Sequence, residues 1–126
     1  MGDISETIQI DVNAMYMEEK SAPTKNHFVF AYSIAITNNG SETVKLLNRH
    51  WYITDDNNMV KEVIGEGVIG RKPKIKPGES FSYTSGAIIE TEFGTMHGSY
   101  EMETTNGEKF TATIPAFLLA MPHKVH

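Results

Sequence analysis

The chain of 126 residues contains no cysteine, which excludes disulfides, thiolate catalysis and cysteine-ligated zinc and fits a reducing compartment. It also lacks a basic excess, because its formal net charge is −5. A protein that binds nucleic acid in general needs such an excess to neutralise phosphates. We therefore expect no nucleic-acid partner.

Long apolar runs are absent as well. No uninterrupted run approaches the 18 residues that a membrane-spanning helix needs. The segment 1–6 is acidic and polar, with neither the basic nor the apolar region of a secretory signal. We expect a cytoplasmic protein with no membrane partner. The length predicts one domain over residues 1–126, with flexible ends at 1–6 and 122–126.

Helical periodicity is missing too, and alternation of apolar and polar residues takes its place. Segment 7–16 alternates strictly, which predicts a half-buried strand. Segment 27–37 is apolar in both phases and predicts a central strand covered on both faces. Segment 43–55 changes phase near Leu46 and predicts a β-bulge there, with Trp51 at the centre of the core.

Turn residues separate these strands at short intervals. Segment 38–41 (Asn-Asn-Gly-Ser) predicts a hairpin turn, as does the Asn-Gly pair at 106–107. The composition of segment 55–58 (Asp-Asp-Asn-Asn) predicts a turn. Four further strands are expected at residues 59–64, 80–83, 96–103 and 109–114. About seven strands without helices predict an all-β antiparallel sandwich of the immunoglobulin or fibronectin type III kind.

Three glycines at G-x-G-x-x-G spacing, Gly65, Gly67 and Gly70, follow an apolar strand. In a dinucleotide-binding fold a helix would come next, but Pro73 and Pro77 exclude a regular helix here. Two interpretations stay open. The backbone N–H groups of the glycines, with the cations that follow them, could hold a phosphate or pyrophosphate group. Alternatively, the glycines form a bend whose cations are solvated.

The phosphate-binding hypothesis names Gly65, Gly67, Gly70, Arg71 and Lys72. Lys74 and Lys76 add local positive charge, whereas the neighbouring glutamates would repel an anion.

No catalytic residues, cofactor or metal site can be assembled from the sequence. The five histidines are scattered, there is no G-x-S-x-G motif, and the paired aspartates at 55–56 are explained by turn formation. His123 and His126 either bind a divalent ion loosely or belong to a tail. The apolar segment 116–121 either packs on the sandwich or forms a patch for a partner or a second copy. A monomer or weak homodimer is expected.

Several motifs occur in a fixed order along almost the whole chain. They are Asn-Arg-His-Trp at 48–51, Gly-Glu-Gly-Val-Ile-Gly at 65–70, Pro-Gly-Glu-Ser-Phe-Ser-Tyr-Thr-Ser-Gly at 77–86, Gly-Thr-Met-His-Gly-Ser-Tyr-Glu-Met at 94–102 and Ile-Pro-Ala-Phe at 114–117. The set resembles the bacterial ApaG family, also called CorD. The resemblance implies a fibronectin III-like sandwich and an association with cobalt and magnesium tolerance. It also implies kinship with eukaryotic domains that look like protein-binding modules, and a proposed pyrophosphate site at Gly65, Gly67 and Gly70.

Two functions from different classes remain. The first is a non-enzymatic binding module with a protein partner and an indirect effect on divalent-ion efflux. The second is a protein that binds, senses or weakly hydrolyses phosphorylated nucleotides through the loop 65–76. The first is favoured, because no general base, nucleophile or metal ligand set can be assembled.

Overall fold

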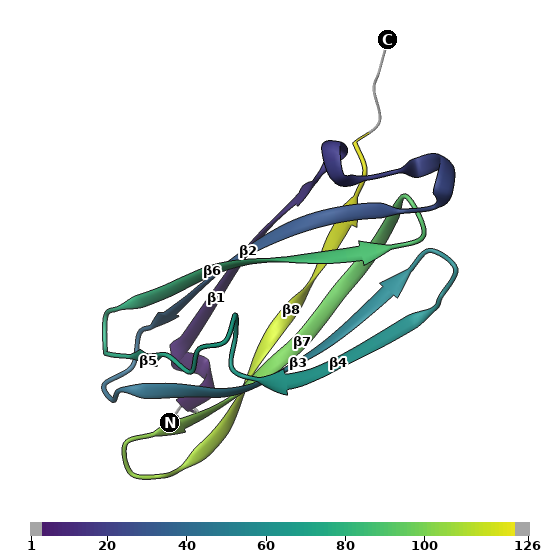
Figure 1. Cartoon of the computed structure of the whole chain (residues 1–126). Helices are drawn as coiled ribbons and strands as arrows, with labels where there is room; N and C mark the ends of the chain where they lie inside the picture. The colour runs from purple at the N-terminus through teal and green to yellow at the C-terminus, as the bar shows by residue number, and fades with distance from the viewer. Residues whose placement is uncertain (1–3, 123–126) are drawn as a thin grey trace.

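The computed structural model describes residues 4–122, which form eight strands and three short 3-10 helices (Figure 1). The helices are Ile4–Thr7, Glu18–Lys20 and Pro23–Lys25. The strands are β1 (Ile8–Tyr16), β2 (Phe28–Asn38), β3 (Val44–Asp55), β4 (Val60–Glu66), β5 (Lys74–Ile75), β6 (Ser80–Ile89), β7 (Phe93–Thr104) and β8 (Lys109–Ala120). Of the ends expected to be flexible, residues 1–3 and 123–126 lie outside the described residues.

The strands form two antiparallel sheets. One sheet has three strands in the order β1-β2-β6, and the other has five, in the order β4-β3-β7-β8 with β5 also paired to β3. The two sheets lie face to face as the layers of a sandwich (Figure 1). The expected all-β sandwich is confirmed. The sequence did not predict β5, because a strand of two residues is too short to show an alternating pattern.

Strand β2 lies between β1 and β6, so its predicted central position is correct. Its even-numbered apolar residues are buried, whereas the opposite face is half-buried and Ser33 is exposed. The prediction that both faces are covered is therefore wrong. Small and polar residues on the second face, such as Ala31 and Thr37, suit a surface that no further layer covers.

The bulge predicted in β3 is confirmed. Leu46 pairs with Met102 and Asn48 pairs with Glu101, so Leu47 has no partner on β7. Its carbonyl oxygen instead accepts a hydrogen bond from Gly67 N–H, at 2.8 Å. The inserted residue changes the phase of the strand, because alternate side chains occupy opposite faces.

The turn predicted at 55–58 and the hairpin turn predicted at 106–107 are confirmed, and they join β3 to β4 and β7 to β8. The prediction of a hairpin at 38–41 is wrong, because β2 and β3 belong to different sheets. Asn38 is buried and holds this crossing together. Its Nδ2 donates to Glu42 O at 2.7 Å and Ile75 O at 2.9 Å, while its Oδ1 accepts from Gly40 N–H.

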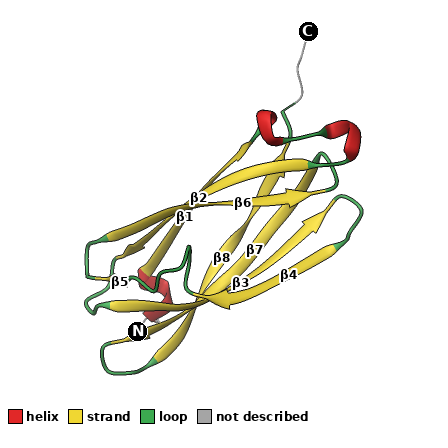
Figure 2. Cartoon of the chain, viewed as in Figure 1, coloured by secondary structure: helices red, strands yellow, loops and turns green. Residues whose placement is uncertain are grey.

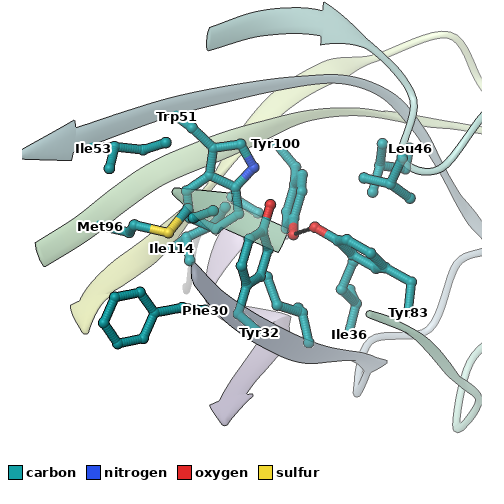
Figure 3. Packing of buried hydrophobic residues seen from close by; sticks show 14 of the residues in the cluster. Phe30, Tyr32, Ile36, Leu46, Trp51, Ile53, Tyr83, Met96, Tyr100 and Ile114 are labelled. Carbon is teal, nitrogen blue, oxygen red and sulfur yellow. Dashed lines mark hydrogen bonds between the residues drawn. The ribbon is translucent and has the colours of Figure 1, made fainter. Parts of the chain in front are cut away.

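The core lies between the sheets, with Trp51 near its centre at 2% exposure (Figure 3). Its ring meets Tyr32, Tyr100 and Phe117 in edge-to-face contacts. The apolar segment 116–121 forms the end of β8, which stops at Ala120. Within it Leu119 is buried, whereas Leu118 is 59% exposed. Within residues 4–122, no helix is long and apolar enough to cross a membrane.

Candidate functional site

The two sides of the sandwich differ. On one side β1 contacts β8, which brings the two sheets together. On the other side the edge strands are β4 and β6, one from each sheet, and each pairs with only one neighbour. The glycine loop leaves the end of β4 on this side and returns to β3 through β5 (Figure 2). We call this side the open side.

The three glycines of the loop have different conformations. Gly65 lies within β4, opposite Arg49. Gly67 is buried and left-handed, with φ +61°. Gly70 and its neighbour Ile69 both have positive φ, at +76° and +44°. Val68 and Arg71 on either side exchange two 2.9 Å hydrogen bonds, so residues 68–71 form a tight turn of type I′.

Most of the donors needed to hold an anion have partners within the protein. Gly67 N–H donates to Leu47 O, and the N–H groups of Val68 and Arg71 donate to each other's carbonyls. The Arg71 guanidinium lies over the Phe81 ring, 5.4 Å from its centroid, while Lys72 Nζ is 3.8 Å from the Glu66 carboxylate. Of the five residues in the phosphate-binding hypothesis, Gly67, Arg71 and Lys72 thus have separate partners within the protein, and that hypothesis stays a prediction.

Arg49 is a functional candidate that the sequence reasoning missed. Because of the bulge it shares the inner phase of β3 with Trp51, and it is half-buried. Its Nη1 donates to Glu66 O at 2.9 Å and to Gly67 O at 3.0 Å. Within residues 4–122 no carboxylate forms an ion pair with it. The sequence did contain one indication of this position. Arg49 is a charged residue two positions before the core tryptophan, and residues two apart in a strand lie on the same face of the sheet.

Gly65 makes room for this guanidinium. A Cβ atom built on Gly65 would lie 2.8 Å from Arg49 Cζ, Nη1 and Nη2, closer than real Cβ contacts. The arginine therefore lies flat against the β4 backbone, with its charge facing the opposite sheet. There it acts on the hydroxyls of Tyr32 and Tyr83, whose pKa values its charge lowers against the larger effect of burial.

Three buried tyrosines lie beside Arg49. The hydroxyls of Tyr83 and Tyr100 are hydrogen-bonded to each other across the two sheets (Figure 3). Burial raises the pKa of Tyr32, Tyr83 and Tyr100 above the ordinary value, because the phenolate would lose its hydration. These hydroxyls are therefore neutral at physiological pH. They can donate and accept hydrogen bonds, but they cannot serve as ready bases.

A mainly apolar groove occupies the far end of the open side, between the β3–β4 hairpin and the end of β6. Its volume is about 350 Å³. The floor includes Ile53 and Ile89, which are buried, and the rim includes Met59, Val60 and Ile88, which are 67%, 59% and 48% exposed. Asp55, Lys61 and Glu90 border it.

The outer face of the five-stranded sheet carries a polar cluster. His50 Nε2 is 2.6 Å from a Glu62 carboxylate oxygen, and Asn48 donates to Glu101 at the same distance. The Tyr52 ring is stacked on His97, with centroids 5.0 Å apart. Within residues 4–122 no group of three or more histidine, aspartate and glutamate side chains could hold a metal ion. The predicted loose site at His123 and His126 lies outside the described residues.

Fold and open side together define a small all-β domain of the immunoglobulin and fibronectin type III kind. A model of the ApaG domain matches residues 18–104. Protein ApaG from Azoarcus sp. is 53% identical over 124 residues, covering 97% of this chain and 98% of the relative. Protein ApaG from Thiobacillus denitrificans is 50% identical over 119 residues, covering 94% of each.

A solved structure agrees with these matches. The crystal structure of the putative ApaA protein from Bordetella pertussis is similar with a TM-score of 0.90 and 44% identity, covering 93% of this chain and 95% of that one. The chain therefore belongs to the ApaG domain family, as the order of its motifs predicted.

Proposed function

We propose that this protein is a non-enzymatic interaction module that engages a partner protein at its open side. The observation that carries the proposal is the apolar groove, whose rim residues Met59, Val60 and Ile88 are large, apolar and exposed. Exposed apolar side chains that gather around one depression are typical of protein-binding surfaces. Association with divalent-ion tolerance would then be an indirect result of that binding, in the cytoplasm.

The chemistry of the remaining surface favours binding over catalysis. The buried tyrosine hydroxyls are neutral and bonded to protein groups. His50 Nε2 already has the Glu62 carboxylate as its hydrogen-bond partner. A nucleophile, its base and an orienting group are what covalent acyl transfer needs together.

Site-specific photo-crosslinking in living cells tests the proposal. The photoreactive residue p-benzoylphenylalanine replaces Met59 at the groove or, as a matched control, Met15 on β1, which is 59% exposed. We expect one dominant protein adduct from position 59 and none from position 15. Equal labelling from both positions, or none from either, would contradict an interaction through the groove.

A second function, binding of a phosphorylated small molecule, is favoured by one observation: Arg49 is a half-buried cation beside the glycine loop without a carboxylate partner in the described chain. Titration of the ¹⁵N-labelled protein with inorganic pyrophosphate tests it. Binding would shift the Gly65, Gly67 and Gly70 amides and the Arg49 Nε resonance at millimolar ligand.

Hydrolysis is tested separately, with dinucleoside polyphosphates as substrates. The non-enzymatic proposal expects no turnover above the rate without protein. Turnover that Arg71→Ala and Lys72→Ala abolish would show instead that the loop 65–76 is a catalytic site.

A further inference from the structure

Arg49 and the groove lie along one line on the open side. Arg49 and Ile53 both project from the inner face of β3, four residues apart, which corresponds to about 13 Å in an extended strand. Ile53 forms part of the floor of the groove. We use the name slit for the edge region between β4 and β6 that runs from Arg49 to the groove.

The two ends of the slit differ in charge. At the groove end, Asp55 and Glu90 outnumber Lys61, so an additional carboxylate is disfavoured there. At the other end, Arg49 uses one of its nitrogens, Nη1, for both of its hydrogen bonds to protein carbonyls. A guanidinium has five N–H donors in a planar fork that suits a carboxylate. The slit therefore favours an apolar group at one end and a carboxylate at the other.

The backbone of the slit also suits an extended segment. Both bordering strands, β4 and β6, pair on one side only, so their outer N–H and C=O groups are available to a further strand. Recognition of an extended peptide at a sheet edge combines such backbone bonds with pockets for alternate side chains. In a strand, residues four apart lie on the same face.

We propose that the slit binds an extended segment of a partner protein that has a large apolar side chain in the groove and an aspartate or glutamate, four residues away, on Arg49. This inference rests on the proposed interaction function and adds the chemistry and spacing of the partner. It assigns Arg49 as the residue that selects an acidic segment.

Synthetic peptides test the spacing directly. The probe is a nine-residue peptide of serine and threonine, blocked at both ends, with leucine at its third position and aspartate at its seventh. The reversed sequence covers the opposite strand direction. In one control peptide asparagine replaces the aspartate, and in a second the aspartate moves to the sixth position, on the other face. Binding is followed by the methyl resonances of Ile53, Ile88 and Ile89 and by the Arg49 Nε–H resonance.

We expect one of the two sequence directions to shift both sets of resonances at millimolar concentration. Each control peptide should bind about tenfold more weakly, because a charge-assisted hydrogen bond is lost. In the protein, Arg49→Gln should reduce the ratio of the affinities for the aspartate and asparagine peptides to about one, while Arg49→Lys keeps part of the preference for aspartate. Ile88→Ser should weaken binding, whereas Leu118→Ser, at an exposed apolar position on β8, should not.

Arg49→Gln also removes the bonds to Glu66 O and Gly67 O, so its folding is checked by thermal melting; the asparagine peptide tests the same contact on the unaltered protein. Equal binding of the aspartate and asparagine peptides, no binding in either direction, or shifts confined to the glycine amides would overturn the inference. Shifts at the groove that grow with protein concentration alone would show a second copy as the occupant and would also overturn it. The proposed function fails separately, if photo-crosslinking at position 59 yields no specific adduct.

Discussion

At the scale of single residues, the glycine motif contains three different solutions to three local problems. Gly65 leaves space for the Arg49 guanidinium, Gly67 combines a left-handed backbone with a close approach to Arg71 O, and Gly70 occupies a left-handed position in open space. The spacing of the motif is shared with dinucleotide-binding loops, but none of these roles depends on a ligand. A substitution series separates them.

Replacing each glycine by alanine should lower the free energy of unfolding to different extents. Gly67→Ala should cost about 3 kcal/mol or more, because its Cβ would lie 2.2 Å from a backbone oxygen at positive φ. Gly70→Ala should cost about 1 kcal/mol, because its Cβ meets no neighbour and only the left-handed backbone conformation is unfavourable. Gly65→Ala should fall between them, since the arginine side chain can shift. Urea denaturation measures all three, with Gly107→Ala as the open-space control; equal losses at Gly67 and Gly70 would contradict these assignments.

Ile69 is the least expected residue of the loop, because a β-branched side chain at φ +44° is strained. It is 53% exposed, so little packing compensates for the strain. Ile69→Asn creates an Asn-Gly pair, which suits a type I′ turn, and should raise the free energy of unfolding by about 1 kcal/mol. Ile64→Asn, at a 70% exposed position in β4, is the matched control and should bring no gain. A thermal melt that shows no rise for Ile69→Asn would indicate an unstrained turn.

At the scale of elements, β3 organises the open side, because β4, β5 and β7 all pair with it. The bulge at Leu47 aligns the inner residues of this strand and also supplies the carbonyl oxygen that fixes Gly67. The connection from β2 then determines where β3 begins. That connection depends on Asn38, whose side chain bridges three backbone groups in a buried position.

Asn38→Asp should lower the free energy of unfolding by about 3 kcal/mol at neutral pH. The substitution removes both Nδ2 donors and places a carboxylate against the carbonyls of Glu42 and Ile75. Asn39→Asp, at an exposed neighbouring position, should cost less than about 1 kcal/mol and serves as the control. Urea denaturation compares the two. Similar losses for both variants would mean that the crossing does not depend on the Asn38 amide.

The sequence could predict seven of the eight strands, because a strand appears as alternation of apolar and polar residues within one segment. It could predict the bulge because a bulge interrupts that alternation. It could not predict the crossing after Asn38, because turn-forming residues indicate a change of direction but not the sheet that the next strand joins. Arg49 was missed for a related reason: a guanidinium on the inner phase is acceptable only when a glycine on the neighbouring strand makes room for it. That neighbour follows from the β3–β4 register, which a sequence pattern does not give.

At the scale of the whole molecule, hydroxyl groups join the two sheets through the middle of an apolar core. Tyr83 from the three-stranded sheet and Tyr100 from the five-stranded sheet share a hydrogen bond, and Tyr32 lies against Trp51 (Figure 3). Trp51 Nε1 is buried and has no hydrogen-bond partner within the described residues. The buried polar side-chain atoms of the core thus include the hydroxyls of Tyr83 and Tyr100 and the Trp51 Nε1. The free energy of unfolding should therefore depend on pH in the range where the tyrosine hydroxyls ionise.

The free energy of unfolding should fall as the pH rises above about 10. Unfolded tyrosine loses its proton near pH 10, whereas burial raises the pKa of Tyr32, Tyr83 and Tyr100 in the folded state. Above that pH the folded state holds more protons than the unfolded state, so each such tyrosine reduces stability by about 1.4 kcal/mol per pH unit. Below pH 10 the hydroxyls are protonated in both states and contribute no slope. Urea denaturation between pH 8 and pH 11 measures the effect, and Tyr83→Phe should reduce the slope by about a third. A slope that Tyr83→Phe leaves unchanged would mean that the Tyr83 hydroxyl ionises as it does in water, and that the core around it admits solvent.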